Sequence, residues 1–229
     1  MLVQIYGITT PSDAAMVNEL QPDHVGVVLD EGIDAWDSVD ERTASAIVQQ
    51  LTDTRLVALS LSVERNRIMK TVETVSPAVL HLARAADEMS IEDLSSLRRE
   101  IDPIDLMVTV PVRDLDAVAT AQTLAPVCEF LLLDTAHPAT GVVGATGLAH
   151  DWSISRAIVQ AVDTRVVLAG GLGPENVAYA IDQVRPAGVD SETRTSLDGD
   201  RRRKDPTKVR AFIDRARTRR LDQADDGGD

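Results

Sequence analysis

Short apolar segments alternate with longer amphipathic segments along nearly all 229 residues of the chain. Short runs rich in Val, Leu and Ile are typical of strands buried on both faces, so these segments predict strands of a parallel sheet. The predicted strands are Leu2–Tyr6, His24–Leu29, Arg55–Ser62, Ala78–Ala83, Asp105–Val110, Glu129–Asp134, Arg165–Ala169 and Ala187–Asp190.

The amphipathic segments between these strands predict helices of about ten to fifteen residues. Several of them open with residues that favour a helix start, such as the proline of Pro11 or the hydroxyl of Ser90. The sequence predicts helices that start at Pro11, Ser90 and Pro174, and helices over Asp40–Leu51, Val63–Val75, Asp114–Leu124 and Pro206–Arg217.

Eight such repeats predict an α/β fold, a single (β/α)8 TIM barrel with a parallel closed sheet. A doubly wound open sheet is the alternative, but it would need a glycine fingerprint after the first strand, and Gly7–Thr10 is not one. We predict one barrel domain over residues 1–219 and a disordered acidic tail over residues 220–229. Catalytic residues of such a barrel lie at the carboxyl ends of its strands.

The net charge of −14 predicts a surface that repels nucleic acids and anionic membranes. With 26 Asp and only 3 Lys, the composition favours adaptation to high salt, the alternative being an ordinary acidic protein. The basic run Arg201–Lys204 is flanked by acids and predicts a solvated loop. We expect a cytoplasmic protein, because no basic leader and no apolar stretch of about 18 residues is present.

The single cysteine, Cys128, and four dispersed histidines give no pattern of metal ligands, so we expect neither a metal nor a disulfide. A more specific signal follows the last two predicted strands. Gly170 and Gly171 allow main-chain N–H groups to approach an anion, unless the segment is only a tight turn into a helix. The candidate phosphate ligands are Gly147, Gly170, Gly171, Leu172, Asp190, Ser191, Thr193 and Arg194, although Arg194 has the alternative of offsetting neighbouring acids.

Two residues at strand ends are candidates for catalysis. Asp134 closes the apolar run Phe130–Leu133, where burial raises the pKa of a carboxyl and suits it to general acid catalysis. A capping or salt-bridged aspartate is the alternative. Tyr6 ends the first predicted strand, and a phenol of ordinary pKa, about 10, is a poor base. Tyr6 could instead donate a hydrogen bond, stack on a substrate, or pack below the barrel mouth.

Several segments resemble the phosphoribosylanthranilate isomerase family. Ile5–Thr9 is similar to the Lys-Ile-Cys-Gly-Ile-Thr opening of that family, and Leu131–Asp134 resembles its strand-six acid. Gly144–Gly147 and His150–Ser153 resemble the loop that follows, and Leu168–Val177 resembles its phosphate loop. The order and spacing of these segments extend the resemblance over nearly the whole chain.

The resemblance implies an Amadori rearrangement, in which a phosphoribosyl amine opens its ribose ring, forms an iminium and loses the proton on C2. It implies that Asp134 protonates the ring oxygen. It makes Gly170, Gly171 and the loop after the eighth strand the phosphate site. The implied substrate is a small phosphorylated sugar, and no metal or organic cofactor is implied.

Four positions depart from the family pattern. Tyr6 stands in place of the catalytic cysteine, Arg194 replaces an expected glycine, and His81 and Arg84 lie in an altered strand-four segment. The Ser-Pro-Arg that holds the anthranilate carboxylate is absent. Our first hypothesis is the family isomerase, with Tyr6 or a neighbour replacing the cysteine. The alternatives are a paralogue for another phosphorylated sugar, which would use His81 and Arg84, and a non-catalytic phosphosugar-binding protein.

Overall fold

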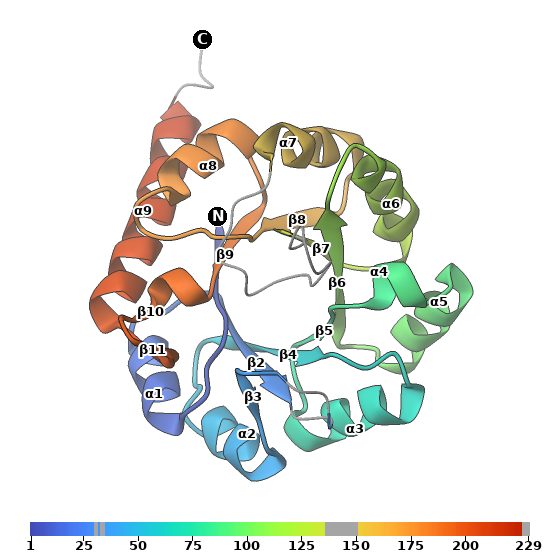
Figure 1. The fold of residues 1–229 in the computed structure, drawn as a ribbon, viewed down its shortest axis with the longest axis horizontal. Coiled ribbons are helices and arrows are strands. Elements are labelled where there is room, and N and C mark those ends of the chain that lie inside the picture. Colours follow the sequence, from blue (N-terminus) through green and yellow to red (C-terminus); the bar gives the residue numbers. More distant parts are fainter. Residues whose placement is uncertain (30–31, 33–34, 136–150, 226–229) are drawn as a thin grey trace.

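The structure is a computed structural model that describes residues 1–29, 32, 35–135 and 151–225. Its parallel strands form a closed ring in the order β1-β2-β4-β5-β6-β7-β8-β9, in which β9 returns to pair with β1 (Figure 1). The ring strands are β1 (Leu2–Ile5), β2 (His24–Leu29), β4 (Arg55–Ser60), β5 (Val79–Leu82), β6 (Asp105–Val112), β7 (Phe130–Thr135), β8 (Arg165–Leu168) and β9 (Gly188–Ser191). The prediction of a (β/α)8 barrel is confirmed.

Helices surround this ring on its outer side (Figure 1). They are α1 (Pro11–Glu19), α2 (Glu41–Val48), α3 (Arg65–Val75), α4 (Ala85–Glu88), α5 (Ile91–Glu100), α6 (Asp116–Leu124), α7 (Trp152–Ala161), α8 (Val177–Val184) and α9 (Pro206–Asp225), with short 3-10 turns η1 (Ala125–Val127) and η2 (Thr193–Thr195). Side chains of Thr10, Asp40 and Ser90 cap α1, α2 and α5 by accepting a main-chain N–H of the first turn. Within the described part of the chain, none of the helices meets the length and hydropathy that crossing a bilayer requires.

The structure differs from the sequence prediction in three segments. The basic run Arg201–Lys204 is not a loop but part of β11 (Asp200–Lys204), which pairs with β10 (Ser196–Leu197) in an antiparallel hairpin. A further short strand, β3 (Ser38–Val39), pairs with β2 and lies between the predicted strand His24–Leu29 and the predicted helix Asp40–Leu51. The backbone of α9 is helical through residues 220–225, where we predicted a disordered tail. Residues 226–229 lie outside the described residues, and the domain boundary at 219 stays a prediction.

Side chains alternate between the two faces of each strand, and this alternation decides which residues enter the barrel. The interior is filled by one apolar cluster that includes Val57, Met107, Phe130 and Leu132. A larger cluster fills the layer between the strands and the helices. Phe130 and Leu132 lie two residues apart on β7, so Asp134 shares their inward-facing side at the carboxyl end of the strand.

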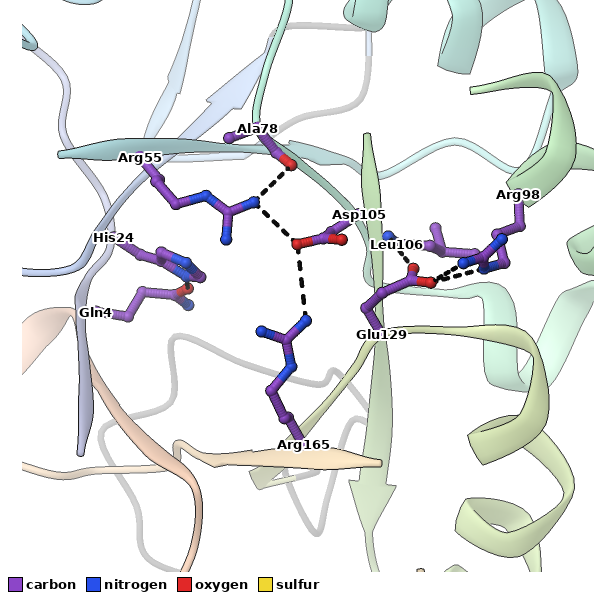
Figure 2. A network of polar contacts seen from close by, with 9 residues as sticks. All are labelled: Gln4, His24, Arg55, Ala78, Arg98, Asp105, Leu106, Glu129 and Arg165. Carbon is purple, nitrogen blue, oxygen red and sulfur yellow. Dashed lines mark hydrogen bonds and ion pairs between the residues drawn. The ribbon is translucent and has the colours of Figure 1, made fainter. Parts of the chain in front are cut away.

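A polar network closes the opposite end of the barrel (Figure 2). Asp105 accepts a hydrogen bond from Arg55 at 2.9 Å and lies 3.7 Å from the guanidinium of Arg165. The guanidinium of Arg165 also stacks 3.8 Å from the centre of the Phe130 ring. Because these residues begin their strands, they lie away from the catalytic end, and we assign them to stability.

We expect Asp105→Asn to lower the melting temperature, since it leaves two arginines facing each other without their shared carboxylate. The loss is about 1 kcal/mol because the arginines are half exposed and water screens the charges. For a chain of this size that corresponds to about 2–4 °C. Asp163→Asn, which removes an exposed acid, is the matched control. Equal melting temperatures for both variants in a thermal scan would contradict the prediction.

Candidate active site

Four carboxyl groups gather at the carboxyl end of the barrel. Asp134 ends the inward-facing series of β7, and Asp190 does the same on β9. Glu192 follows Asp190 by two residues, and Asp37 approaches from the segment before β3. The charge of Asp134 acts on Asp190, and those of Asp37 and Asp190 act on Glu192. The barrel mouth is therefore a strongly acidic site.

Burial sets the protonation of Asp134 and Asp190. Burial raises the pKa of Asp134 to about 7, although its Oδ1 accepts a hydrogen bond from the N–H of Thr135 at 2.7 Å. Burial and then the neighbouring Asp134 raise the pKa of Asp190 to about 8. Gln4 donates to Asp190 Oδ1 at 3.1 Å and opposes this rise. A carboxyl with a pKa near neutrality can both hold and release a proton during catalysis.

Tyr6 fills the barrel interior, and its hydroxyl is hydrogen-bonded there. Its side chain is 5% exposed, and its hydroxyl lies 2.9 Å from His81 Nδ1. His81 Nε2 lies 2.7 Å from Thr109 Oγ1. Burial raises the pKa of Tyr6 well above its ordinary value and lowers that of His81 to about 3. A neutral phenol that donates to a neutral imidazole satisfies both rings.

The hydrogen bond between Tyr6 and His81 predicts that the Tyr6 hydroxyl stabilises the fold. Tyr6→Phe removes the hydroxyl and leaves buried His81 Nδ1 without its partner. We expect a loss of about 1–3 kcal/mol in the free energy of unfolding, measured by urea denaturation. Tyr179→Phe changes the only other tyrosine, which is 61% exposed on α8, and serves as the control. Equal stability of the two variants would contradict a structural role for the Tyr6 hydroxyl.

The loop after β8 has the backbone that the sequence predicted for an anion site. Gly170 and Gly171 have φ of +81° and +64°, a region that other residues rarely adopt. The side chain of Asn176 holds the loop by accepting from the N–H of Gly173 at 2.8 Å and donating to the carbonyl of Gly171 at 3.0 Å. We had predicted a helix from Pro174, but α8 starts at Val177 because residues 174–176 complete this turn.

The loops after β8 and β9 are joined by a hydrogen bond. Ser191 Oγ donates to the carbonyl of Leu172 at 2.7 Å, and both residues are buried. Thr193 lies nearby at the start of η2. Five of the predicted phosphate ligands are thus brought to neighbouring strand ends, namely Gly170, Gly171, Leu172, Ser191 and Thr193. Gly147 lies outside the described residues.

The two predicted arginine ligands engage acidic side chains at the surface. Arg194 pairs with Glu175 at 2.9 Å, and both side chains are about half exposed. Arg84 pairs with Glu88 one helical turn away on α4. His81 is enclosed below the mouth by Tyr6 and Thr109. His81 and both arginines are thus each engaged by protein groups.

Sequence reasoning missed the residues that complete the mouth. Lys204 is 2% exposed, and its Nζ donates to the main-chain carbonyl of Glu192 at 2.8 Å and to Ser196 Oγ at 3.2 Å. Burial lowers the pKa of Lys204 to about 8, although the surrounding carboxylates favour its charged form. Glu192 could have been found from its spacing, because it lies two residues beyond Asp190 on the inward-facing series.

The β10–β11 hairpin holds the segment that carries Asp37. Arg202 donates to the main-chain carbonyls of Trp36 and, at 3.2 Å, Ser38. The guanidinium of Arg201 stacks 4.2 Å from the centre of the Trp36 ring. Figure 1 shows the hairpin beside α1, where Arg203 pairs with Asp13 at 2.9 Å. A region distant in sequence therefore positions an acid at the mouth.

Comparison with known proteins decides the family. Residues 3–215 match the family described as N-(5'phosphoribosyl)anthranilate (PRA) isomerase. The chain belongs to this family. The N-(5'-phosphoribosyl)anthranilate isomerase of Haloferax volcanii is 36% identical to this member of the family over 221 residues, which cover 95% of this chain and 94% of the relative.

Solved structures of the phosphoribosylanthranilate isomerase family share the fold. The enzyme from Thermotoga maritima superposes with a TM-score of 0.78 at 28% identity, covering 94% of this chain and 98% of that one. A second isomerase structure, in complex with reduced 1-(o-carboxyphenylamino)-1-deoxyribulose 5-phosphate, superposes with a TM-score of 0.76 at 26% identity and the same coverage. The predicted family is confirmed.

Proposed function

We propose that this barrel isomerises N-(5'-phosphoribosyl)anthranilate, or a closely similar phosphoribosyl amine, to the corresponding ketose. The observation that carries the proposal is Asp134, an inward-facing carboxyl at the end of β7 whose pKa burial raises to about 7. Membership of the isomerase family supports this function over a paralogue for another sugar and over a non-catalytic binding protein.

In the proposed reaction, Asp134 donates its proton to the ring oxygen of the ribose. The ring opens as the nitrogen lone pair forms an iminium at C1. Loss of the C2 proton then gives an enolamine, which becomes the ketose when C1 is protonated and the hydroxyl on C2 releases its proton. Each step moves only protons between protein and substrate and electron pairs within the substrate, so the proposal includes no metal and no organic cofactor.

The phosphate of the substrate would bind between the loops after β8 and β9. Main-chain N–H groups around Gly170 and Gly171 would face the anion. Ser191, at the end of β9, and Thr193, in the loop that follows, would bind it from the other side. For Arg194 to bind the phosphate, it would have to leave Glu175. Asp190 lies within β9 beside Asp134 and not in the loop that follows, so it would contact the sugar rather than the phosphate.

The function is tested by complementation and by a direct assay. The gene is expressed in a tryptophan auxotroph that lacks this isomerase, and the purified protein is assayed with freshly generated phosphoribosylanthranilate over a range of KCl concentrations. We expect growth and turnover. A folded protein that supports neither in any salt concentration would refute the proposal.

We also propose that the acidic surface adapts this protein to high salt in the cytoplasm. With a net charge of −14, repulsion between surface carboxylates opposes the compact state, and salt screens that repulsion. We expect the melting temperature to rise as KCl increases towards molar concentrations. A melting temperature that stays constant or falls with KCl would contradict this adaptation.

A further inference from the structure

The proposed reaction needs a base for the C2 proton, and Tyr6 does not supply one. The ring of Tyr6 is packed against β2, where a Cβ on Gly26 would lie only 2.6 Å from its atoms. Its hydroxyl is bound to His81. Cys128, the only cysteine, precedes β7 and so lies at the opposite end of the barrel. The resemblance places the catalytic cysteine of the family at residue 6. The base must therefore be another residue near the end of β1.

Glu192 is the acidic side chain that reaches this place. Strands β1 and β9 pair with Ile5 opposite Ser191, so the next residues along, Tyr6 and Glu192, are neighbours. The side chain of Glu192 folds over Gly7, because its Oε1 and Cγ lie 2.7 and 3.0 Å from the position of a Cβ on that glycine. The missing side chain of Gly7 thus makes room for a carboxyl beside residue 6.

The carboxyl of Glu192 has an acceptor with no partner. Its Oε1 is buried and makes no hydrogen bond with any residue that the structure describes. A buried carboxyl oxygen without a donor is unfavourable, so such a group calls for an explanation, and proton transfer in catalysis is one.

Charged and titratable groups from four elements surround Glu192. Asp37 shares a side-chain hydrogen bond with it from the segment before β3, and Asp190 faces it from β9. Lys204 of β11 faces it as a cation, and Tyr6 lies beside it directly after β1. Burial, and then Asp37, raise the pKa of Glu192 above its ordinary range. Two adjacent carboxyls repel each other when both are ionised, so the charge of the neighbour adds to the rise in the pKa of Glu192.

We propose that Glu192, paired with Asp37, is the base that removes the C2 proton in place of the cysteine of the family. This inference rests on the function proposed above. The C2–H bond breaks, and its electron pair forms the C1=C2 double bond. The C1=N π pair moves to nitrogen and neutralises the iminium. The proton passes to the carboxylate of Glu192, which in this proposal contacts the reacting carbon.

The test measures the proton-abstraction step in Glu192→Gln, which keeps the size of the side chain but cannot accept the proton. We expect kcat to fall by about 10²- to 10⁴-fold. KM should change little, because the phosphate site is intact. Substrate deuterated at C2 should show a larger isotope effect on kcat in the variant, since C–H cleavage then limits turnover. Glu192→Asp should retain part of the activity.

Two controls separate the outcomes. Glu73→Gln removes an exposed acid from α3 and should leave kcat unchanged. If Glu192→Gln fails to fold, the test is instead whether added formate restores turnover to Glu192→Ala. No restored turnover would overturn the proposal. A Glu192→Gln variant within about tenfold of wild type, alongside inactive Asp134→Asn, would overturn the base assignment alone. No turnover by the wild type would overturn both this inference and the proposed function.

Discussion

Replacing Asp134 with Asn is expected to lower turnover of phosphoribosylanthranilate by about 10²- to 10⁴-fold. Asn has the same shape but cannot donate a carboxyl proton to the ring oxygen, so the ring stays closed. Most of the loss should appear in kcat, because the phosphate site that we propose lies on the neighbouring loops after β8 and β9. Steady-state assays of wild type, Asp134→Asn and the exposed control Asp163→Asn measure the effect. Equal kcat values for all three would contradict an acid role for Asp134.

The pKa of Asp134 also predicts a pH dependence of the wild-type enzyme. The acid must carry its proton, so kcat/KM should fall as pH rises through about 7, where the carboxyl ionises. The free energy of unfolding should also fall as pH rises. Because the pKa rises from 3.8 in the unfolded chain to about 7 in the fold, the contribution of Asp134 to stability is present below pH 4 and lost by pH 7.

Asp134→Asn should therefore be more stable than the wild type, and the difference should widen as pH increases from 4 to 7. Thermal scans at several pH values check this expectation. The result also shows that the inactive variant is folded. A gap that narrows with increasing pH would mean that the carboxyl is not held neutral by burial.

Gly26→Ala is expected to have the largest effect on stability. A Cβ at this position would lie 2.6 Å from three ring atoms of Tyr6, closer than real contacts allow, and the ring is enclosed by the barrel. Overpacking of this kind costs about 1–3 kcal/mol, or more where the neighbour cannot move. For a chain of this size each kcal/mol lowers the melting temperature by about 2–4 °C.

A double-mutant cycle identifies the cause of that loss. Tyr6→Cys removes the ring, so Gly26→Ala should cost much less in the Tyr6→Cys background than in the wild type. We expect a coupling energy of about 1–3 kcal/mol from urea denaturation of the four proteins. Strictly additive effects would show that the clash with Tyr6 is not the reason.

Much of the barrel follows from local sequence, and so does part of the site. Short buried strands between amphipathic helices are recognisable because each strand is covered on both faces, and the eight predicted strands are all present. Asp134 could be predicted because it ends an apolar run, and Gly170 and Gly171 because their positive φ needs residues without a Cβ. These features depend on neighbouring residues, which the sequence displays directly.

Long-range contacts escaped that reasoning. The sequence of Arg201–Lys204 predicts a solvated loop, because nothing nearby indicates that Arg202 binds main-chain carbonyls from the segment before β3. The pairing of Glu192 with Asp37 joins residues from opposite ends of the chain. Such contacts arise only when the sheet closes and β9 meets β1.

The sequence by itself determined the order of strands and helices, the acid at the end of β7 and the glycine loop after β8, because each depends on local periodicity and backbone preference. Only the tertiary structure decided the direction of Tyr6 and the environment of Glu192. Because Gly26 has no side chain, the ring of Tyr6 packs inside the barrel. Because Gly7 has none, the carboxyl of Glu192 lies at the mouth. Both arrangements depend on which strands lie side by side, and the strands become neighbours only when the barrel closes.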